Sequence, residues 1–185
     1  MKKTIFILFI ALISCKTEIK KEVIQEKTVS RVLGKKYFVF DEILHFKNNV
    51  LDDEVGDIYE NRKLSSFDSI KNGIVLGYDS ESTPKSIVDT SFIDNLDKFG
   101  YKKFVVTKGS FSAIDSIFAN KEADVLAAGC VYVYRDILIF KKKSKIVGIA
   151  KICFHCNDSF IVGNKLDGAQ INQFEDYQRL EKLLK

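Results

Sequence analysis

The chain has 185 residues, of which 46% are hydrophobic and 29% are charged, and its 15 Phe and 7 Tyr can supply a core. This composition matches an ordinary soluble protein, and about 150 residues are left for one globular domain once a signal and a tether are set aside. The formal net charge of +4 falls to +2 if Lys2 and Lys3 leave with a signal peptide, which argues against nucleic acid as a partner.

The N-terminal segment has the layout of an export signal. Lys2 and Lys3 form a positively charged start, and residues 4–13 form an apolar stretch. Ten residues are too few for a permanent transmembrane helix, which needs about 20. We therefore interpret the stretch as the apolar part of a signal peptide.

The end of this segment, Leu12-Ile13-Ser14-Cys15, resembles the lipobox of bacterial lipoproteins. The resemblance implies that residues 1–14 are removed as the signal peptide and that Cys15 becomes a lipidated N-terminus. Several acyl chains, such as palmitate, would make attachment effectively permanent, because each buried methylene contributes about 0.8 kcal/mol. We expect a cell-envelope protein that is anchored to a membrane outside the cytosol, on its periplasmic face or at the cell surface.

Residues 15–36 are predicted to be the lipidated cysteine and a flexible tether. After Cys15 the segment is rich in Lys and Glu and has no aromatic residue, so it cannot bury much surface. A random coil of this length holds a domain on the order of 25 Å from the bilayer. Residues 37–185 are predicted to form one globular domain that can meet soluble partners.

The first elements of the domain are predicted from short apolar runs. Residues 37–40 are predicted to form a short strand, and residues 42–46 extend it or pair with it. A short helix is expected over 52–62. Residues 74–78 lie between turn signals and are predicted to form a strand.

A helix is expected after the start signal at residues 82–84. Phe92, Leu96 and Phe99 recur there at helical spacing, and Gly100 is a suitable stop.

A short buried strand over 104–106 follows. The next helix is expected from Ser110 or Ser112 to Asn120. Its inward side chains are predicted to be Ile114, Ile117 and Phe118.

The strongest prediction is a β-hairpin formed by residues 130–140 and 145–153. Residues 141–144 are expected to form its turn, and a strand over 159–162 continues it as a meander. Residues 173–185 are predicted to form a closing amphipathic helix. The inward residues of that helix are predicted to be Phe174, Tyr177, Leu180, Leu183 and Leu184.

These elements favour an α+β fold, because strands and helices occur in runs without a regular βαβ alternation. The prediction is a single domain with a mainly antiparallel sheet that helices cover on one face.

One compact motif contains reactive residue types, Cys153-Phe154-His155-Cys156. A thiol–disulfide oxidoreductase needs a thiolate stabilised at a helix N-terminus, but another apparent strand follows this motif. Haem attachment is disfavoured because the histidine does not directly follow the second cysteine. Structural use is favoured, either as a small disulfide ring or as buried thiols, with Cys130 unpaired or exchanging partners.

A zinc site is the other reading of the same residues. Its ligands would come from Cys130, Cys153, Cys156, His155 and His45, but one CxxC pair without a second is a weak signal. Zinc is the only cofactor that the sequence brings into consideration.

No catalytic residue is predicted. The chain has no Gly-x-Ser-x-Gly elbow and no phosphate-binding loop, and its two histidines are His45 and His155. A hydrolase with a dispersed site would show as a polar cleft that gathers one of them with carboxylates. Arg135-Asp136 is expected to supply a cross-strand ion pair rather than a site.

Three segments together resemble small lipoproteins and secreted proteins of Bacteroidota: Tyr134–Phe140, Lys151–Cys156 and Asp176–Leu180. The resemblance implies no activity and no catalytic residue. The leading hypothesis is a lipid-anchored, non-enzymatic protein that binds a protein or another envelope component, for example as an immunity or inhibitor protein. The alternative is a thiol redox or zinc-binding envelope protein that uses Cys153 and Cys156.

Overall fold

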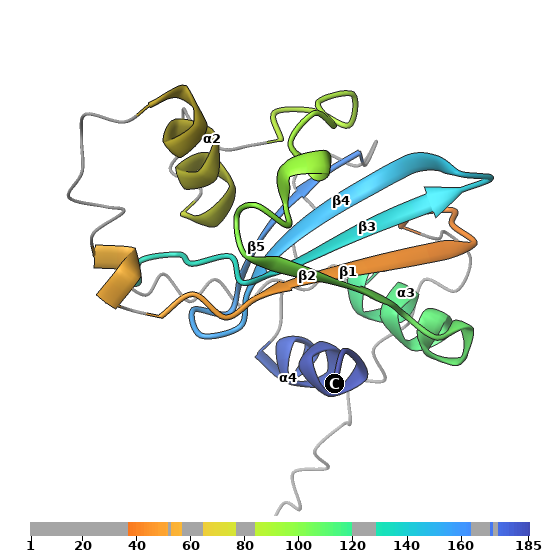
Figure 1. Ribbon diagram of the computed structural model, residues 1–185. Coiled ribbons are helices and arrows are strands. Elements are labelled where there is room, and N and C mark those ends of the chain that lie inside the picture. The colour runs from red at the N-terminus through yellow and green to blue at the C-terminus, as the bar shows by residue number, and fades with distance from the viewer. Residues whose placement is uncertain are drawn as a thin grey trace, which may run out of the picture. The chain divides into compact units, whose positions relative to one another are not determined.

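A five-stranded antiparallel sheet lies at the centre of the protein (Figure 1). The structure is a computed structural model, and it describes residues 37–51, 53–56, 65–76, 84–119, 129–163, 171 and 174–185. These residues all belong to one compact unit, Val32–Lys185. The predicted signal peptide, Cys15 and the tether lie outside the described residues.

The sheet has the strand order β2-β1-β3-β4-β5, and every neighbouring pair is antiparallel. With the described helices it makes an α+β architecture, as predicted. The strands are β1 (Glu42–Asn48), β2 (Tyr101–Val105), β3 (Asp136–Lys142), β4 (Lys145–Cys153) and β5 (Asp158–Val162).

The predicted hairpin and meander are confirmed as β3, β4 and β5. The turn between β3 and β4 is shorter than expected, because the strand continues through Lys142. Lys143 and Ser144 form the turn with φ angles of 47° and 64°, the left-handed geometry of a two-residue hairpin turn. The start of the hairpin also differs from the prediction, because β3 begins at Asp136 and residues 130–135 are outside the sheet.

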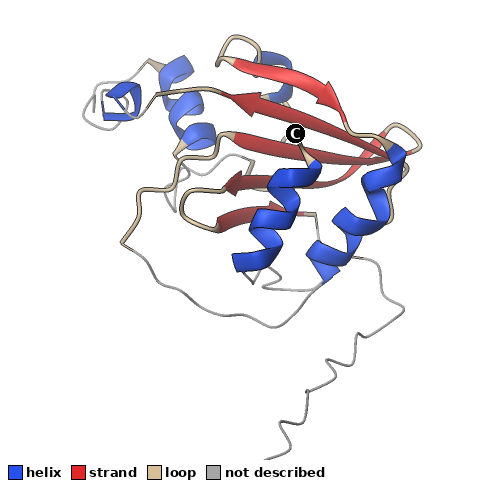
Figure 2. Ribbon diagram, turned by 90° about the horizontal axis from the view of Figure 1, so that it is seen from below, coloured by secondary structure: helices blue, strands red, loops and turns tan. Residues whose placement is uncertain are grey.

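Helices cover both faces of the sheet, whereas cover on one face was predicted. Helix α2 (Ser66–Val75) lies on one face, and α3 (Phe111–Ala119) and α4 (Phe174–Leu183) lie on the other (Figures 1 and 2). The reason can be read in β3, where Ile137 and Ile139 pack in the core on the α2 face while Leu138 and Phe140 pack on the α3 and α4 face. A continuous apolar run of this kind is typical of a strand buried on both sides.

The aromatic segment before β1 does not form the predicted strand. Tyr37 and Phe38 are nonetheless buried, and the Phe38 ring lies 4.7 Å from that of Phe140. A Cβ atom at Gly148 of β4 would overlap the Phe38 ring. The aromatic run therefore packs on the sheet instead of pairing with it.

The strand predicted over 74–78 is also wrong within the described residues. Ile74 and Val75 are the last turn of α2, and residues 77–78 lie outside the described part of the chain. The helix begins at a Ser65 N-cap, whose hydroxyl accepts a hydrogen bond from the Asp68 amide. Ile74 and Val75 are buried because they face the sheet from a helix.

No α-helix forms over 84–100, where a helix was expected. This stretch contains turns and one 3₁₀ helix, Ile93–Asn95. Phe92, Leu96 and Phe99 are still all buried in the core. Gly100 ends the segment with a φ of 91°. The apolar spacing therefore predicted correctly which residues are buried, but the α-helix predicted from it is wrong.

Helices α3 and α4 are confirmed with small differences. Ile114, Ile117 and Phe118 of α3 are buried as predicted, and α3 follows a 3₁₀ turn at Lys108–Ser110. In α4 Tyr177 and Leu180 are buried, but Phe174 is half exposed. Of the helix expected over 52–62, residues 53–56 are helical and the rest lie outside the described residues.

Candidate functional site

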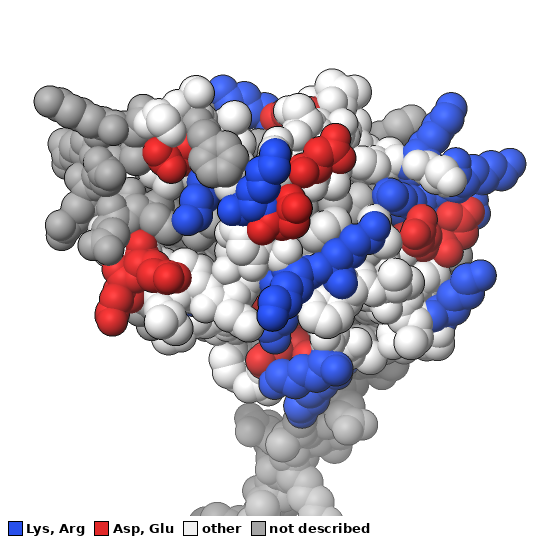
Figure 3. Space-filling model, viewed as in Figure 1, with Lys and Arg blue, Asp and Glu red and all other residues white. Residues whose placement is uncertain are grey.

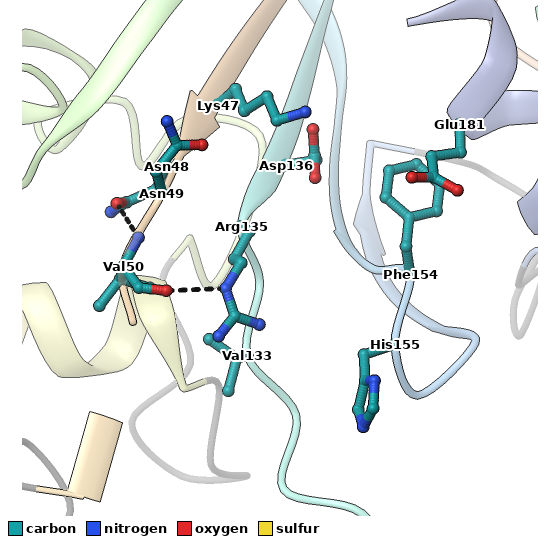
Figure 4. A pocket seen from close by; sticks show the side chains of 10 residues that line it. All are labelled: Lys47, Asn48, Asn49, Val50, Val133, Arg135, Asp136, Phe154, His155 and Glu181. Carbon is teal, nitrogen blue, oxygen red and sulfur yellow. Dashed lines mark hydrogen bonds between the residues drawn. The ribbon is translucent and has the colours of Figure 1, made fainter. Parts of the chain in front are cut away.

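A cleft of about 380 Å³ opens at one end of the sheet (Figure 4). It is formed by the end of β1, the start of β3, the turn between β4 and β5, and α4. Seven of its ten lining residues are polar or charged, and they include side chains of both charges. The lining residues are Lys47, Asn48, Asn49, Val50, Val133, Arg135, Asp136, Phe154, His155 and Glu181.

Asp136 is the most deeply buried charged residue of the cleft, with 6% of its surface exposed. It lies opposite Lys47 in the register of β1 and β3. Its Oδ1 atom is 2.7 Å from Nε2 of His45, a residue of β1 that is 2% exposed. A cross-strand ion pair, rather than a site, was predicted for Arg135-Asp136. Asp136 bonds to a histidine of the neighbouring strand, whereas Arg135 lies outside the sheet, and both residues line the cleft.

Backbone contacts hold the other polar side chains of the cleft. The Nε–H of Arg135 donates to the Val50 carbonyl at 2.9 Å. The Asn48 side chain donates to the Phe99 carbonyl at 3.0 Å and accepts from the Val50 amide at 2.9 Å. These bonds join β1 to the neighbouring segments and fix the positions of the Asn48 and Arg135 side chains.

The cleft matches part of what a dispersed hydrolase site would show. It gathers His155 with the carboxylates of Asp136 and Glu181. None of its ten lining residues is a serine, threonine or cysteine, and Asp136 is already bonded to His45. The arrangement presents charged groups of both signs in one cleft.

The cysteines pair differently from the small ring considered above. Cys156 forms a disulfide with Cys130, with a Cα–Cα distance of 5.9 Å, and Cys153 is a buried free thiol. Cys153 is the last residue of β4 and faces inward, whereas Cys156 lies in the next turn, beside the segment that leads into β3. The pair is separated by 26 positions, so no local motif could indicate it.

The surroundings of Cys153 do not favour a reactive thiolate. Burial raises the pKa of the thiol, and hydrogen bonds from the Val133 and Cys156 backbone offset this only in part. A reactive cysteine needs an exposed position and a lowered pKa. The Cys153–Cys156 pair therefore lacks the features of a thiol redox centre.

The residues considered for zinc are not brought together. His45 is bonded to Asp136 on the sheet, and His155 lines the cleft. Cys130 and Cys156 are joined to each other, which removes both thiolates as ligands. Among the described residues, no group of three or more His, Cys, Asp or Glu side chains is placed to hold a metal ion.

A second feature is the exposed edge of the sheet formed by β2, which has only β1 as a neighbour among the described strands. Phe104 is 50% exposed and Val105 is 69% exposed, although this strand was predicted to be buried. Lys102 lies directly opposite Lys47 of β1. Figure 3 shows basic side chains crossing the face on which β2 lies in front.

Lys151 is a residue that sequence reasoning missed. It is fully buried in β4, and its ammonium donates to the carbonyls of Gly73 and Ile74 at the end of α2, at 2.8 and 3.3 Å. The rings of Tyr134 and Phe160 lie 4.6 and 5.0 Å from it. The sequence feature that could have indicated this buried residue is the single lysine inside the apolar run 146–153. Because Lys151 is fully buried, its role is to support the fold rather than to contact a ligand.

The described helices are short, with ten residues each in α2 and α4. None of the described helices is long and apolar enough to span a membrane. Comparison with protein-family models, curated proteins and solved structures finds no match to this chain.

Proposed function

We propose that this chain is a lipid-anchored protein of the cell envelope whose domain binds another protein without catalysing a reaction. The lipobox ending at Cys15 supports the anchor. The exposed β2 edge supports the binding activity. An immunity or inhibitor role fits this arrangement, because such a protein acts by occupying its partner.

The β2 edge has the properties of a strand-addition site. An edge strand presents backbone N–H and C=O groups that can pair with an incoming extended segment. Natural edge strands are often protected by charged side chains, especially Lys. This strand has Lys102 and Lys103, but it also exposes two apolar side chains, Phe104 and Val105. They would give the added strand apolar contacts on both faces of the sheet.

The charge of this edge indicates an acidic partner segment. Lys102 and Lys47 lie opposite each other across β2 and β1, and like charges in such positions destabilise a sheet. Asp136 faces Lys47 from β3 on its other side, so Lys102 is the cation of this pair that has no carboxylate opposite it in the register. Lys103 adds a further exposed ammonium on the other face. Carboxylates on the added strand would offset this repulsion, so binding should weaken as salt is raised.

The test of binding uses the full-length protein in native membranes. We expect a partner to copurify after cross-linking at low salt and to be lost with Val105→Glu, which places a negative charge on the edge. Val88→Glu is the matched control, because Val88 is also exposed but lies outside the sheet. Retention of the same partner by the Val105→Glu protein would refute binding at this edge.

The test of the anchor is separate. Cys15→Ser removes the thiol that would be acylated, so we expect the protein to move from the membrane fraction to the soluble fraction. Mass spectrometry should then show the loss of the lipid mass. If location and mass are both unchanged, the anchoring proposal is wrong.

A further inference from the structure

We infer that the β2 edge selects a short extended segment that pairs antiparallel to β2 and carries two apolar residues followed by two acidic residues. This inference rests on the proposed function, because it specifies the partner segment of the same edge. The supporting observations are the phase of the hydrogen bonds between β1 and β2, the two ends of the open edge, and the order of the side chains along it.

The backbone groups of β2 that face the open edge follow from the bonds that the strand already makes. The Val106 amide donates to the Ile43 carbonyl of β1 at 3.2 Å, so these two residues form a hydrogen-bonded pair. Such pairs alternate with non-bonded pairs along an antiparallel ladder. The N–H and C=O groups of Val105 and Lys103 therefore point away from β1 and toward the open edge.

Other bonds close the two ends of this edge. At the start of β2 the Tyr101 amide donates to the Leu96 carbonyl at 2.9 Å. Beyond the end of the strand, the Thr107 carbonyl accepts from the Ser110 amide at 3.0 Å in a 3₁₀ turn. Residues 102–105 lie between these two bonds and are exposed at every position. The partner segment is therefore recognised over this short stretch.

The side chains of this stretch are ordered by face and by charge. Lys102 and Phe104 lie on the α3 and α4 face, where the Phe104 ring is 5.9 Å from that of His45. Lys103 and Val105 lie on the α2 face, because successive side chains of a strand point to opposite faces. On each face the lysine comes before the apolar residue along β2.

These side chains determine what an added strand should carry. Among the described residues, no ion pair involves Lys102 or Lys103. Carboxylates directly opposite the two lysines would lie at the close distance of cross-strand neighbours, and apolar side chains opposite Phe104 and Val105 would cover exposed apolar surface. The partner therefore has an acidic half and an apolar half.

The direction of the added strand determines the order of the two halves. Every neighbouring pair of strands in the sheet is antiparallel, and antiparallel pairing is slightly more stable per residue than parallel pairing. An antiparallel segment meets Val105 first and Lys102 last. From its N-terminus, the segment has two apolar residues and then two acidic residues, and the amides of its first and third residues point at β2.

The experiment is calorimetric titration of the full-length protein in detergent with two hexapeptides. One is acetyl-Thr-Val-Phe-Glu-Glu-Thr-amide, and the other has the reversed order, acetyl-Thr-Glu-Glu-Phe-Val-Thr-amide. They share composition, charge and end groups. We expect the first to bind at least about tenfold more tightly, because in antiparallel pairing only the first places carboxylates opposite both lysines. Equal or tighter binding of the reversed peptide, or no binding of either peptide in the millimolar range, would overturn the inference.

Methylation of single amides in the first peptide tests the hydrogen-bond phase. A methyl group on the amide of the first Glu, which lies opposite Lys103, removes a donor that points at β2. We expect the affinity to fall at least about tenfold. The matched control is a methyl group on the amide of the second Glu, which points away from β2 and should leave the affinity unchanged. Equal losses for the two methylated peptides would contradict this phase.

A charge exchange tests the register. Lys102→Glu should weaken binding of the first peptide, and a peptide with Lys in place of its second Glu should recover that loss, because the opposite charges are restored. Lys98→Glu is the control, since Lys98 is exposed but lies outside the sheet, and it should bind the first peptide like the wild type. If the exchanged peptide recovers nothing, the inferred register is wrong. The proposed function would still stand in that case if the native partner copurifies with the wild type and is lost with Val105→Glu.

Discussion

Lys151 is a cation in the core, held by two carbonyls and two aromatic rings rather than by a carboxylate in any ion pair seen among the described residues. Its amine bonds to the last carbonyls of α2, which is where a positive charge stabilises a helix. Burial nevertheless disfavours the charged form and lowers the pKa of the lysine to about 7. The residue thus connects the stability of the protein to pH.

We predict that Lys151→Met changes the pH dependence of stability. Between pH 7 and the ordinary lysine pKa of 10.5 the unfolded chain holds a proton that the folded chain has lost, so the free energy of unfolding rises with pH. As the pH rises, the free energy of unfolding of the wild type should increase relative to that of the variant by at most about 1.4 kcal/mol per pH unit. Denaturant unfolding of both proteins from pH 7 to 9 measures this difference.

The control for that experiment is Lys145→Met, at the exposed end of the same strand. It should leave the pH dependence as in the wild type. A difference between wild type and Lys151→Met that stays constant from pH 7 to 9 would show that the Lys151 pKa is not lowered.

At the scale of the elements, packing against the sheet decided what local patterns left open. The apolar spacing over 92–99 suits an α-helix, yet the segment satisfies the same burial with a 3₁₀ turn that reaches β2 through Gly100. Residues 37–40 have strand-forming side chains, but Phe38 packs its ring against Phe140 of β3 and Gly148 of β4 instead. Hydrophobic periodicity shows which residues are buried more reliably than the conformation in which they are buried.

The contact between Phe38 and β4 gives a prediction at this scale. Gly148→Ala adds a methyl group that would overlap the Phe38 ring, so we expect the free energy of unfolding to fall by about 1 to 3 kcal/mol. The double variant with Gly148→Ala and Phe38→Ala should lose less free energy of unfolding than the two single variants lose in sum, because the truncated side chain no longer overlaps the added methyl group. Chemical denaturation of the single and double variants measures both effects.

Gly109→Ala is the matched control, since a Cβ at Gly109 meets nothing within 4 Å. It should change stability by less than about 0.5 kcal/mol. Equal stability of Gly148→Ala and the wild type would mean that the segment 37–40 does not pack on β4 as described.

At the scale of the whole molecule, the Cys130–Cys156 disulfide ties the segment before β3 to the turn after β4. Both cysteines lie outside the strands, and the disulfide is close to the cleft through His155. The hydrophobic clusters of the two sheet faces do not contain either residue. The fold should therefore survive reduction with lower stability.

We predict that reduction lowers the free energy of unfolding by about 3 to 4 kcal/mol, because a loop of 26 positions is no longer closed in the unfolded chain. Alkylation with mass measurement checks the pairing. Besides the anchor cysteine, one thiol, that of Cys153, should react after unfolding without reductant, and three should react with it. Reaction of Cys130 without reductant would contradict the disulfide.

The sequence by itself determined the features that depend on neighbours along the chain. The hairpin, the meander, the inward face of α3 and the α+β class follow from turn residues and from apolar periodicity, which act over a few positions. The lipobox around Cys15 is local in the same way, and the anchor proposed from it needs no tertiary contact.

Only the tertiary structure decided which distant residues meet. His45 and Asp136 are separated by 91 positions, Cys130 and Cys156 by 26, and Lys151 and Gly73 by 78. Their contacts depend on strand order and on which face each side chain occupies, and a shift of one residue in register would reverse every face. The cleft and the charges that it gathers exist for this reason, and no local pattern in the sequence could have indicated them.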